Sequence, residues 1–528
     1  MNPASNAPAR APLAGVRILD LTRLLPGPLA TQHLADYGAE VIKVEDTGAG
    51  DYARTMGAMG GDTSWFYQLV NRNKRSLRLD LKNDEGRALF LRLVETADVV
   101  VEGFRPGVME RLGLGYAALA ARNPRVVLCS ISGYGQTGPY ALRAGHDINY
   151  LGYAGVLDQI GCAGGAPALS NLQIGDLLGG TMGAVMGILV ALFDARRSGH
   201  GREVDVSMTD AAFAHMIFPL AEVLARGGVR SRGEDLLTGG VPCYGVYETA
   251  DGRHMAVGAL EEKFWALLCA TLGRADLIPG HLAAGEEGAR VRAELATIFR
   301  SRSQREWVEL FDPVDCCVTP VLRMEESLHD PQLRARGMVV EAAGLRHAGP
   351  AVRLGGMPPM QDAPAPVRAG ADTDAILEAL GVGADERARS SAPTPSASRI
   401  ASVSAPARTG AGASCIGGIP PSRTAGPAWR RPAASTTMPR ARSWGSCRLS
   451  SMRSTGVTQQ STGSNSSTHS RWLRLRKIVA SSARTRAPSS PAARCPGIRS
   501  ARPSVAHSSA QNFSSSAPTA MWRPSAVS

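Results

Sequence analysis

The stretch Gly15-Val16-Arg17-Ile18-Leu19-Asp20-Leu21 is the first apolar run of the sequence, and it predicts a buried β-strand. The turn Pro26-Gly27-Pro28 follows, and Leu29–Tyr37 has the pattern of a helix that Gly38 ends. Glu40–Val44 is then a second apolar run of strand length. A strand, a helix and a strand in this order form a βαβ unit, which predicts a parallel sheet.

The same alternation continues along the chain. Arg87–Ala97 predicts a helix and Val99–Val101 a strand, and Ala117–Arg122 and Val126–Ser130 repeat the pair. We therefore expect an α/β fold with a Rossmann-like, doubly wound large domain over residues 1–225. Ligands of such sheets bind at the carboxyl ends of the strands, where the Gly- and Pro-rich loop Ser130–Tyr140 is expected to lie.

A second unit begins near residue 239. Tyr244–Thr249 and His254–Val257, joined by the turn Asp251-Gly252, predict a β-hairpin, and Lys263–Leu272 predicts a helix. We expect a smaller α+β domain over residues 226–331. Residues 332–386 are then expected to form a return segment that packs on the large domain.

The net charge of +12 is confined to the end of the chain. No acidic residue follows Glu386, so 37 of the 58 basic residues, against all 46 acidic ones, belong to residues 1–386. This part of the chain is acidic, which argues against a nucleic-acid partner for it. Residues 387–528 are expected to form a low-complexity basic tail, rich in Ser, Arg, Ala and Pro, with a single lysine, Lys477.

Three interpretations of this tail compete. In the first, the tail is a disordered segment, because its composition cannot bury enough apolar surface to offset its ordering entropy. In the second, it is the product of a wrong reading frame in a GC-rich gene, which tends to give arginine without lysine or acids. In the third, it is a nucleic-acid-binding arm, for which Arg471–Lys477 is the one dense basic cluster.

Cysteine usage and apolar runs bear on the compartment. The nine cysteines are scattered without a Cys-x-x-Cys pair, and Met1–Arg10 has no apolar core of a signal peptide. We therefore expect reduced thiols and a cytoplasmic protein. The apolar run Leu177–Phe193 is 17 residues long and Gly-rich, so we expect a buried core helix and no membrane partner.

No spacing typical of metal ligands and no Walker loop occurs in the sequence, so we expect no metal site. One Gly-x-Gly-x-x-Gly match, Gly133–Gly138, follows a predicted strand. However, Pro139 and Gly145 leave no room for the long helix that would hold a dinucleotide pyrophosphate. A plain loop is the preferred interpretation.

Two motifs carry acid/base chemistry. Gly145-His146-Asp147-Ile148-Asn149-Tyr150 offers an imidazole, and Gly175-Asp176 offers a carboxylate just before the predicted core helix. Two such groups on opposite faces of a carbon acid can remove a proton from one face and return it on the other. Each has a structural alternative, since Asp176 could serve only as a helix N-cap and His146 as a loop histidine bonded to backbone.

Together with further motifs, these residues resemble the family III CoA-transferases, and within that family the α-methylacyl-CoA racemases most. The resemblance runs from about Leu13 to about Leu380. The motifs that carry it are Pro26-Gly27-Pro28, Lys74–Lys82, Glu102–Val108, Gly135–Pro139, Gly145–Tyr150, Gly175-Asp176, Val257–Glu261 and Asp315–Val321.

The resemblance implies an interlocked homodimer, an acyl-CoA thioester as substrate and no bound cofactor. It implies that His146 and Asp176 are the acid/base pair and that Glu261 completes the pocket from the small domain. It also implies that seven residues contact CoA, which are Arg105, Arg111, Gly103, Leu79, Lys43, Asn149 and Tyr150. The two arginines are expected to bind its phosphates. One departure matters, because Asp46 stands where racemases tend to place an arginine, and Lys43, Arg72 or Lys74 is expected to substitute for it.

The predicted function is interconversion of the (R) and (S) forms of 2-methylacyl-CoA thioesters through an enolate. The alternative is CoA transfer between carboxylic acids through an aspartyl intermediate at Asp176. The short stretch Leu237–Cys243 and the presence of His146 favour the racemase over transferases of the formyl-CoA type, which tend to have a long Gly-rich loop and to lack this histidine.

Overall fold

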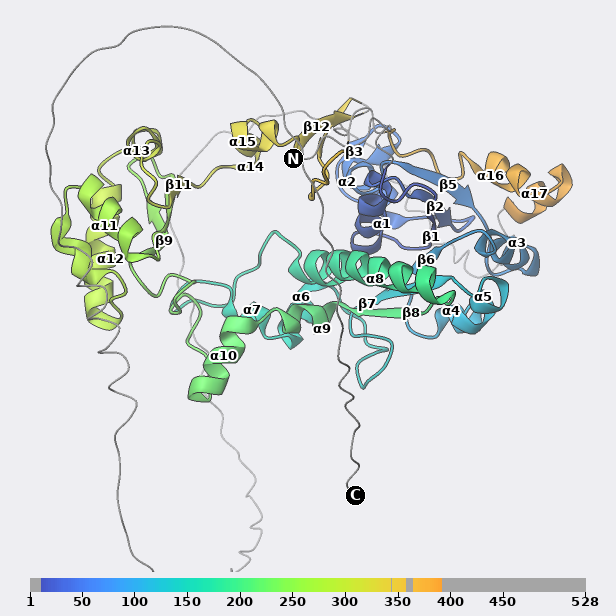
Figure 1. Ribbon diagram of the computed structural model, residues 1–528, viewed down its shortest axis with the longest axis horizontal. Coiled ribbons are helices and arrows are strands. Elements are labelled where there is room, and N and C mark those ends of the chain that lie inside the picture. Colours follow the sequence, from blue (N-terminus) through green and yellow to red (C-terminus); the bar gives the residue numbers. More distant parts are fainter. Residues whose placement is uncertain (1–10, 343, 358–363, 392–528) are drawn as a thin grey trace, which may run out of the picture. The chain divides into compact units, whose positions relative to one another are not determined.

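The predicted βαβ unit is present in the structure, a computed structural model that describes residues 11–342, 344–357 and 364–391 (Figure 1). Strands β1 (Arg17–Asp20) and β2 (Glu40–Glu45) pair in parallel and are joined by α1 (Pro26–Asp36). Proline at the first positions of α1 suits a helix start, because its missing N–H would have no partner there.

The central sheet has six parallel strands in the order β5-β2-β1-β6-β7-β8. The chain winds outward from β1 in one direction and then restarts at β6 in the other, so β1 and β6 flank the point where the strand order reverses. Loops that leave the carboxyl ends of these strands border the natural ligand crevice of such a sheet. The remaining strands are β5 (Lys74–Arg78), β6 (Val99–Glu102), β7 (Val127–Ser132) and β8 (Glu203–Ser207).

Helices cover both faces of this sheet, which confirms the doubly wound prediction (Figure 1). One apolar core joins the sheet to α3 (Asp84–Val94), α5 (Tyr116–Arg122) and α16 (Thr373–Ala379). The other joins it to α1 and α8 (Gly183–Ser198). The return segment reaches the sheet edge at β5, where the Ser76 N–H donates to the carboxylate of Asp372 at 2.9 Å.

The predicted β-hairpin is also present. Strands β9 (Tyr244–Glu248) and β10 (His254–Gly258) are antiparallel, and β11 (Val318–Pro320) adds to β10. Their core is closed by the aromatic side chains of Trp265, Phe299 and Trp307, all nearly inaccessible. These come from α11 (Glu262–Thr271), α12 (Gly285–Phe299) and α13 (Gln304–Phe311).

Shorter elements connect these parts. The predicted tail boundary at residue 387 falls inside the last described helix, and residues 392–528 lie outside the described part, so the tail prediction is untested. The connecting elements are η1 (Tyr52–Thr55), β3 (Met59–Gly60), β4 (Thr63–Ser64), α2 (Trp65–Val70), α4 (Val108–Arg111), α6 (Asp147–Tyr153), α7 (Val156–Gln159), α9 (Met208–Ala214), α10 (Ile217–Arg226), η3 (Ala275–Gly280), α14 (Met324–Ser327), α15 (Pro331–Ala335), β12 (Val339–Ala342), β13 (Leu345–Ala348) and α17 (Ala384–Ser391).

The predicted core helix begins earlier and is less buried than expected. A π-helical turn, η2 (Gly175–Met182), leads without a break into α8. Among the described residues, Gly175–Ser198 is the one helix long and apolar enough to cross a membrane, and the bent pair α9 and α10 would make a second span. One face of α8 packs on the sheet, but Met186, Val190 and Phe193 are about two-thirds exposed.

Two glycines of η2 allow close helix packing. Gly179 and Gly180 are both buried against protein. A Cβ on Gly179 would lie 2.7 Å from the carbonyl oxygen of Met208, and one on Gly180 would lie 2.6 Å from Pro26 Cβ. These glycines therefore set the distance of η2 from α9 and α1.

Gly179→Ala is expected to lower the free energy of unfolding by about 1–3 kcal/mol, because the added methyl overlaps backbone that cannot swing away. Gly152→Ala is the matched control, since Gly152 is an exposed helical glycine with open space around it, and alanine there favours the helix. Urea unfolding of both variants measures the difference. Equal stabilities would show that η2 can shift without cost.

Candidate active site

A cavity of about 450 Å³ lies at the carboxyl ends of β6 and β7. It is bounded by the loop that follows β6, which carries Gly103 and Arg105, and by the loop that follows β7. The latter runs from Gly133 to His146 without regular structure, which confirms the loop interpretation of the Gly-x-Gly-x-x-Gly match. Two arginines and one histidine line the cavity, whereas no carboxylate among the described residues does.

His146 occupies the N-cap position of α6. Its backbone N–H donates to the side-chain oxygen of Asn149 at 3.0 Å, so Asn149 fixes the cap. Tyr150, the residue after Asn149, holds the loop before His146, because its hydroxyl donates to the carbonyl of Gly145 at 2.6 Å. A Cβ on Gly133 or on Gly145 would come within 2.7 Å of the Tyr150 ring, so both glycines make room for it. The ring therefore fixes the peptide before His146.

Asp176 meets this cap through Asp147. The backbone N–H of Asp176 donates to the carboxylate of Asp147 at 3.0 Å, which ties the start of η2 to the first turn of α6. Burial, and after it the charge of Asp147, raise the pKa of Asp176 to about 6, although His146 acts in the opposite direction. Through Asp147, the residue after His146, the structure thus ties Asp176 to the segment that carries the histidine. Asp176 lies within the helix and not at its N-cap, so the capping alternative was wrong.

Sequence reasoning missed the part played by Asp147. The residue belongs to the quoted motif, but its type alone does not tell whether it acts on substrate or on a neighbouring segment. Only the fold reveals that a helix 29 residues further on offers its amide to this carboxylate.

Asp176→Asn is expected to stabilise the protein above pH 6. The folded-state pKa of about 6 exceeds the ordinary 3.8, so folding disfavours the charged carboxylate, and this cost grows as the pH rises through that interval. We expect a gain of about 1–3 kcal/mol at pH 8 and a smaller gain at pH 5. Urea unfolding at both pH values measures it, with the exposed Asp62→Asn as control. A pH-independent effect would contradict the raised pKa.

The predicted phosphate contacts Arg105 and Arg111 are both exposed, and among the described residues neither forms an ion pair. Arg105 and Gly103 line the cavity, together with Asn149 and Tyr150. Arg111 ends α4, whose N-cap, Gly107, takes a left-handed conformation with φ of 80°. Their roles in CoA binding stay predictions.

The side chains of two other predicted CoA contacts are buried. Lys43 is 1% exposed, and its ammonium group binds the carboxylate of Asp51 and the carbonyl of Thr22, each at 2.9 Å. The Leu79 side chain packs in the apolar core at 1% exposure. Neither side chain is accessible to a ligand.

The predicted substitutes for the missing arginine fail for the same reason. Arg72 and Lys74 are buried, and they pair with Asp36 and Asp20, respectively. Asp46 instead accepts from the guanidinium of Arg23 at 2.7 Å and from the N–H groups of Gly48 and Gly50. At this position the chain therefore presents an acid–arginine pair.

Glu261 is the exposed N-cap residue of α11 and belongs to the unit of the three-stranded sheet. Within the described parts of the chain, no hydrogen bond or ion pair joins it to His146 or Asp176. Its charge acts on Cys317, whose pKa is raised by burial first and then by Glu261.

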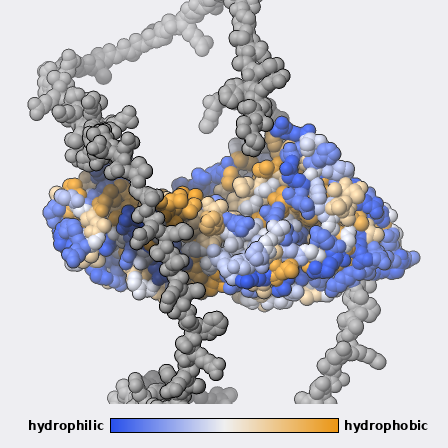
Figure 2. Space-filling model, turned by 90° about the horizontal axis from the view of Figure 1, so that it is seen from below, coloured by the Kyte–Doolittle hydropathy of each residue, from blue (hydrophilic) through white to orange (hydrophobic). Residues whose placement is uncertain are grey.

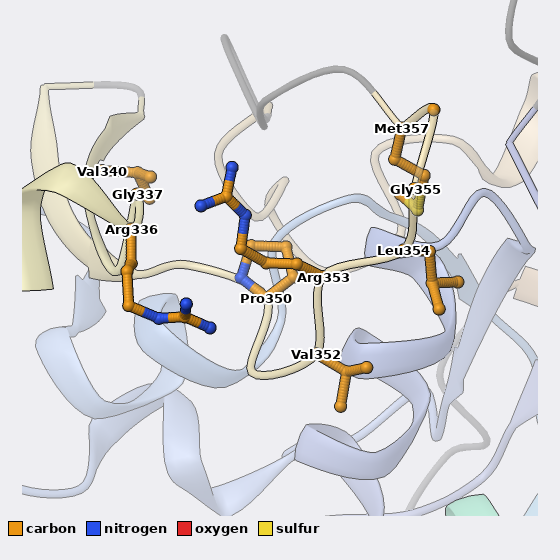
Figure 3. A pocket seen from close by; sticks show the side chains of 10 residues that line it. Arg336, Gly337, Val340, Pro350, Val352, Arg353, Leu354, Gly355 and Met357 are labelled. Carbon is orange, nitrogen blue, oxygen red and sulfur yellow. The ribbon is translucent and has the colours of Figure 1, made fainter. Parts of the chain in front are cut away.

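A second cavity of about 380 Å³ lies in the return segment (Figure 3). Arg336 and Arg353 line it together with apolar residues such as Val340, Pro350 and Leu354. No carboxyl, imidazole, thiol or hydroxyl side chain is among its lining residues, so it offers no acid or base for catalysis. Among the described residues that line it, this cavity therefore has none of the acid/base groups that the sequence indicated.

Comparison with known proteins identifies the family. The family model described as CoA-transferase family III matches residues 13–373. α-Methylacyl-CoA racemase of Mus musculus is 37% identical over 377 residues, which cover 71% of this chain and 94% of the relative. Succinyl-CoA:glutarate CoA-transferase of Homo sapiens is 33% identical over 380 residues, or 70% of this chain and 86% of the relative.

A crystal structure of a CAIB/BAIF family protein from Brucella suis has a TM-score of 0.63 and 28% sequence identity, and the match covers 70% of this chain and all of that one. The family model alone spans well over half of the 528 residues. The chain belongs to CoA-transferase family III.

Proposed function

We propose that the protein is an epimerase that interconverts the (R) and (S) forms of 2-methylacyl-CoA thioesters. The observation that carries this proposal is that His146 lines the cavity, while Asp147, the residue next to it, accepts a hydrogen bond from the backbone N–H of Asp176 at 3.0 Å. The pKa of about 6 makes Asp176 able to act both as an acid and as a base near neutral pH.

The mechanism follows from this pair. In one direction the neutral imidazole of His146 removes the α-proton from one face, and the protonated carboxyl of Asp176 returns a proton to the other face of the enolate. In the reverse direction the Asp176 carboxylate is the base and the imidazolium is the acid. The thioester carbonyl takes up the charge between the two steps, and no group beyond the substrate is needed.

CoA transfer is the second candidate. A carboxylate held beside a thioester site can attack it, form an acyl anhydride and then take up CoA as an aspartyl thioester. The transferase relatives favour this reaction, and Asp176 would be the nucleophile. It gives His146 no required part, which is why we prefer the epimerase.

One experiment separates the two functions. A chiral 2-methylacyl-CoA incubated in D₂O should lose its configuration and take up deuterium at the α-carbon. Succinate or oxalate added as acceptor should yield no new CoA ester. An anhydride trapped by hydroxylamine, or a CoA adduct on Asp176, would overturn the epimerase proposal in favour of transfer.

We further propose that two chains share each site, with Glu261 supplied by the partner in a homodimer. The described part of a single chain leaves apolar faces uncovered, which appear as apolar patches among hydrophilic surface (Figure 2). None of the side chains of α10 is buried, although Ile217, Phe218 and Leu224 are apolar and more than half exposed. A second copy offers the cover that one chain lacks.

Mixed dimers test this arrangement. Asp176→Ala and Glu261→Ala chains, inactive alone, should regain part of the activity after refolding together, because some mixed dimers contain one intact site. The control mixes Asp176→Ala with His146→Ala chains. Because both residues belong to the same half of each proposed site, every site in such a mixed dimer keeps one defect, and no activity should return. Verified mixed dimers of the first pair without activity would contradict the shared site.

A further inference from the structure

Arg143 is held in place three residues before His146. Its guanidinium carbon lies 4.0 Å from the ring centroid of Tyr140, and one of its nitrogens donates to the hydroxyl of Tyr153 at 2.7 Å. Tyr140 and Tyr153 are themselves in contact, with ring centroids 4.8 Å apart. The side chain therefore rests on an aromatic platform instead of moving freely in solvent.

No acidic side chain in the described part of the chain neutralises the charge of Arg143. Among the described residues it forms no ion pair, and it is exposed in the cavity that His146 and Arg105 also line. A guanidinium has five N–H donors, of which Tyr153 takes one, so several remain for a ligand. Arginine in such a setting is suited to carboxylate or phosphate oxygens, which accept two parallel hydrogen bonds.

We propose that Arg143 is a further substrate-binding residue that holds an anionic oxygen group of the CoA thioester, either a carboxylate on the acyl chain or a phosphate of CoA. The proposal rests on the proposed function only in taking CoA thioesters as ligands. Because the guanidinium is already oriented, little side-chain entropy is lost on binding, and the contact contributes most of its strength to affinity.

Binding measurements test this without relying on turnover. Isothermal titration with CoA, dephospho-CoA, propionyl-CoA and succinyl-CoA gives dissociation constants for the wild-type protein and for Arg143→Gln. We expect the substitution to weaken at least one ligand by about 10-fold or more, as for the loss of a charged hydrogen bond. Arg143→Lys should recover part of the loss, because it restores the charge but not the planar fork.

The pattern of losses identifies the anionic group. A loss confined to succinyl-CoA places the carboxylate of the acyl chain on Arg143. A loss for all ligands except dephospho-CoA indicates the 3′-phosphate, and a loss for all four indicates the pyrophosphate. Tyr153→Phe should reproduce a smaller loss of the same pattern, since it removes the hydrogen bond that orients the guanidinium.

Arg125→Gln is the matched control, because Arg125 is an exposed arginine that precedes β7 at the opposite end of that strand. Dissociation constants within about twofold of wild type for all four ligands in Arg143→Gln would overturn the proposal, and so would an equal loss in the control. If the esters bind through Arg143 but are neither epimerised nor used for transfer, the proposed function fails while this inference stands.

Discussion

His146→Ala and Asp176→Ala are each expected to lower the epimerisation rate by at least about 10²-fold, the low end for loss of a general base. Inversion needs a proton removed from one face and another delivered to the opposite face. With one group gone, the other can still exchange the α-proton on its own face, but it cannot complete inversion. Loss of optical activity of a chiral 2-methylacyl-CoA, followed by polarimetry, gives the rate.

Deuterium uptake adds a sharper readout. In D₂O each variant should exchange the α-proton of one enantiomer faster than that of the other, and the preferred enantiomer should differ between the two variants. The exposed His200→Ala and Asp62→Ala serve as controls and should keep normal turnover. Near-normal inversion in either active-site variant would remove that residue from the mechanism.

Lys74→Met is expected to cost about 3–5 kcal/mol of unfolding free energy, the largest stability effect we predict. Lys74 binds Asp20 at 3.0 Å in the core, where both side chains are almost fully buried. Burial opposes the charge on Asp20, but Lys74, Lys43 and the hydroxyls of Thr22 and Thr31 outweigh it and hold the pKa of Asp20 below its ordinary value. Removal of Lys74 leaves a buried carboxylate without its main partner.

Arg75→Met, one residue along the same strand, is the matched control. Arg75 pairs with Glu40 at the surface, and its side chain is 40% exposed, so we expect a change below about 1 kcal/mol. The double variant Asp20→Asn/Lys74→Met should recover part of the loss of Lys74→Met, because no unpaired charge is left. Urea unfolding measures all three, and similar costs for Lys74→Met and Arg75→Met would contradict the buried pair.

Patterning predicted the elements of the fold well. The apolar runs Gly15–Leu21 and Glu40–Val44 contain β1 and most of β2, because short-range periodicity determines strands. The predicted hairpin turns at Asp251-Gly252, as its turn chemistry indicates. In both cases the signal is local. The acid/base pair of His146 and Asp176 stays a prediction, although the sequence motifs that indicated it are short and distinctive.

What the sequence could not reveal depends on long-range contacts. Lys43 and Lys74 look like ligand contacts or a wet strand face in one dimension, and only the tertiary structure shows their buried acidic partners. Gly179 could equally face a ligand or a neighbouring helix, and the proximity of Met208 decides the matter. Burial of a charged side chain is not a property of its residue type.

The hydrogen bond from the amide of Asp176 to Asp147 bears on how activities diverge within a fold. It anchors the carboxylate through main chain and through a neighbour of His146, and the imidazole takes no part in it. A lineage that exchanges the histidine would therefore inherit Asp176 in an unchanged position, still able to attack a thioester. A change from epimerisation to CoA transfer would then require replacement of His146, the N-cap residue of α6, without a change in the main chain that positions Asp176.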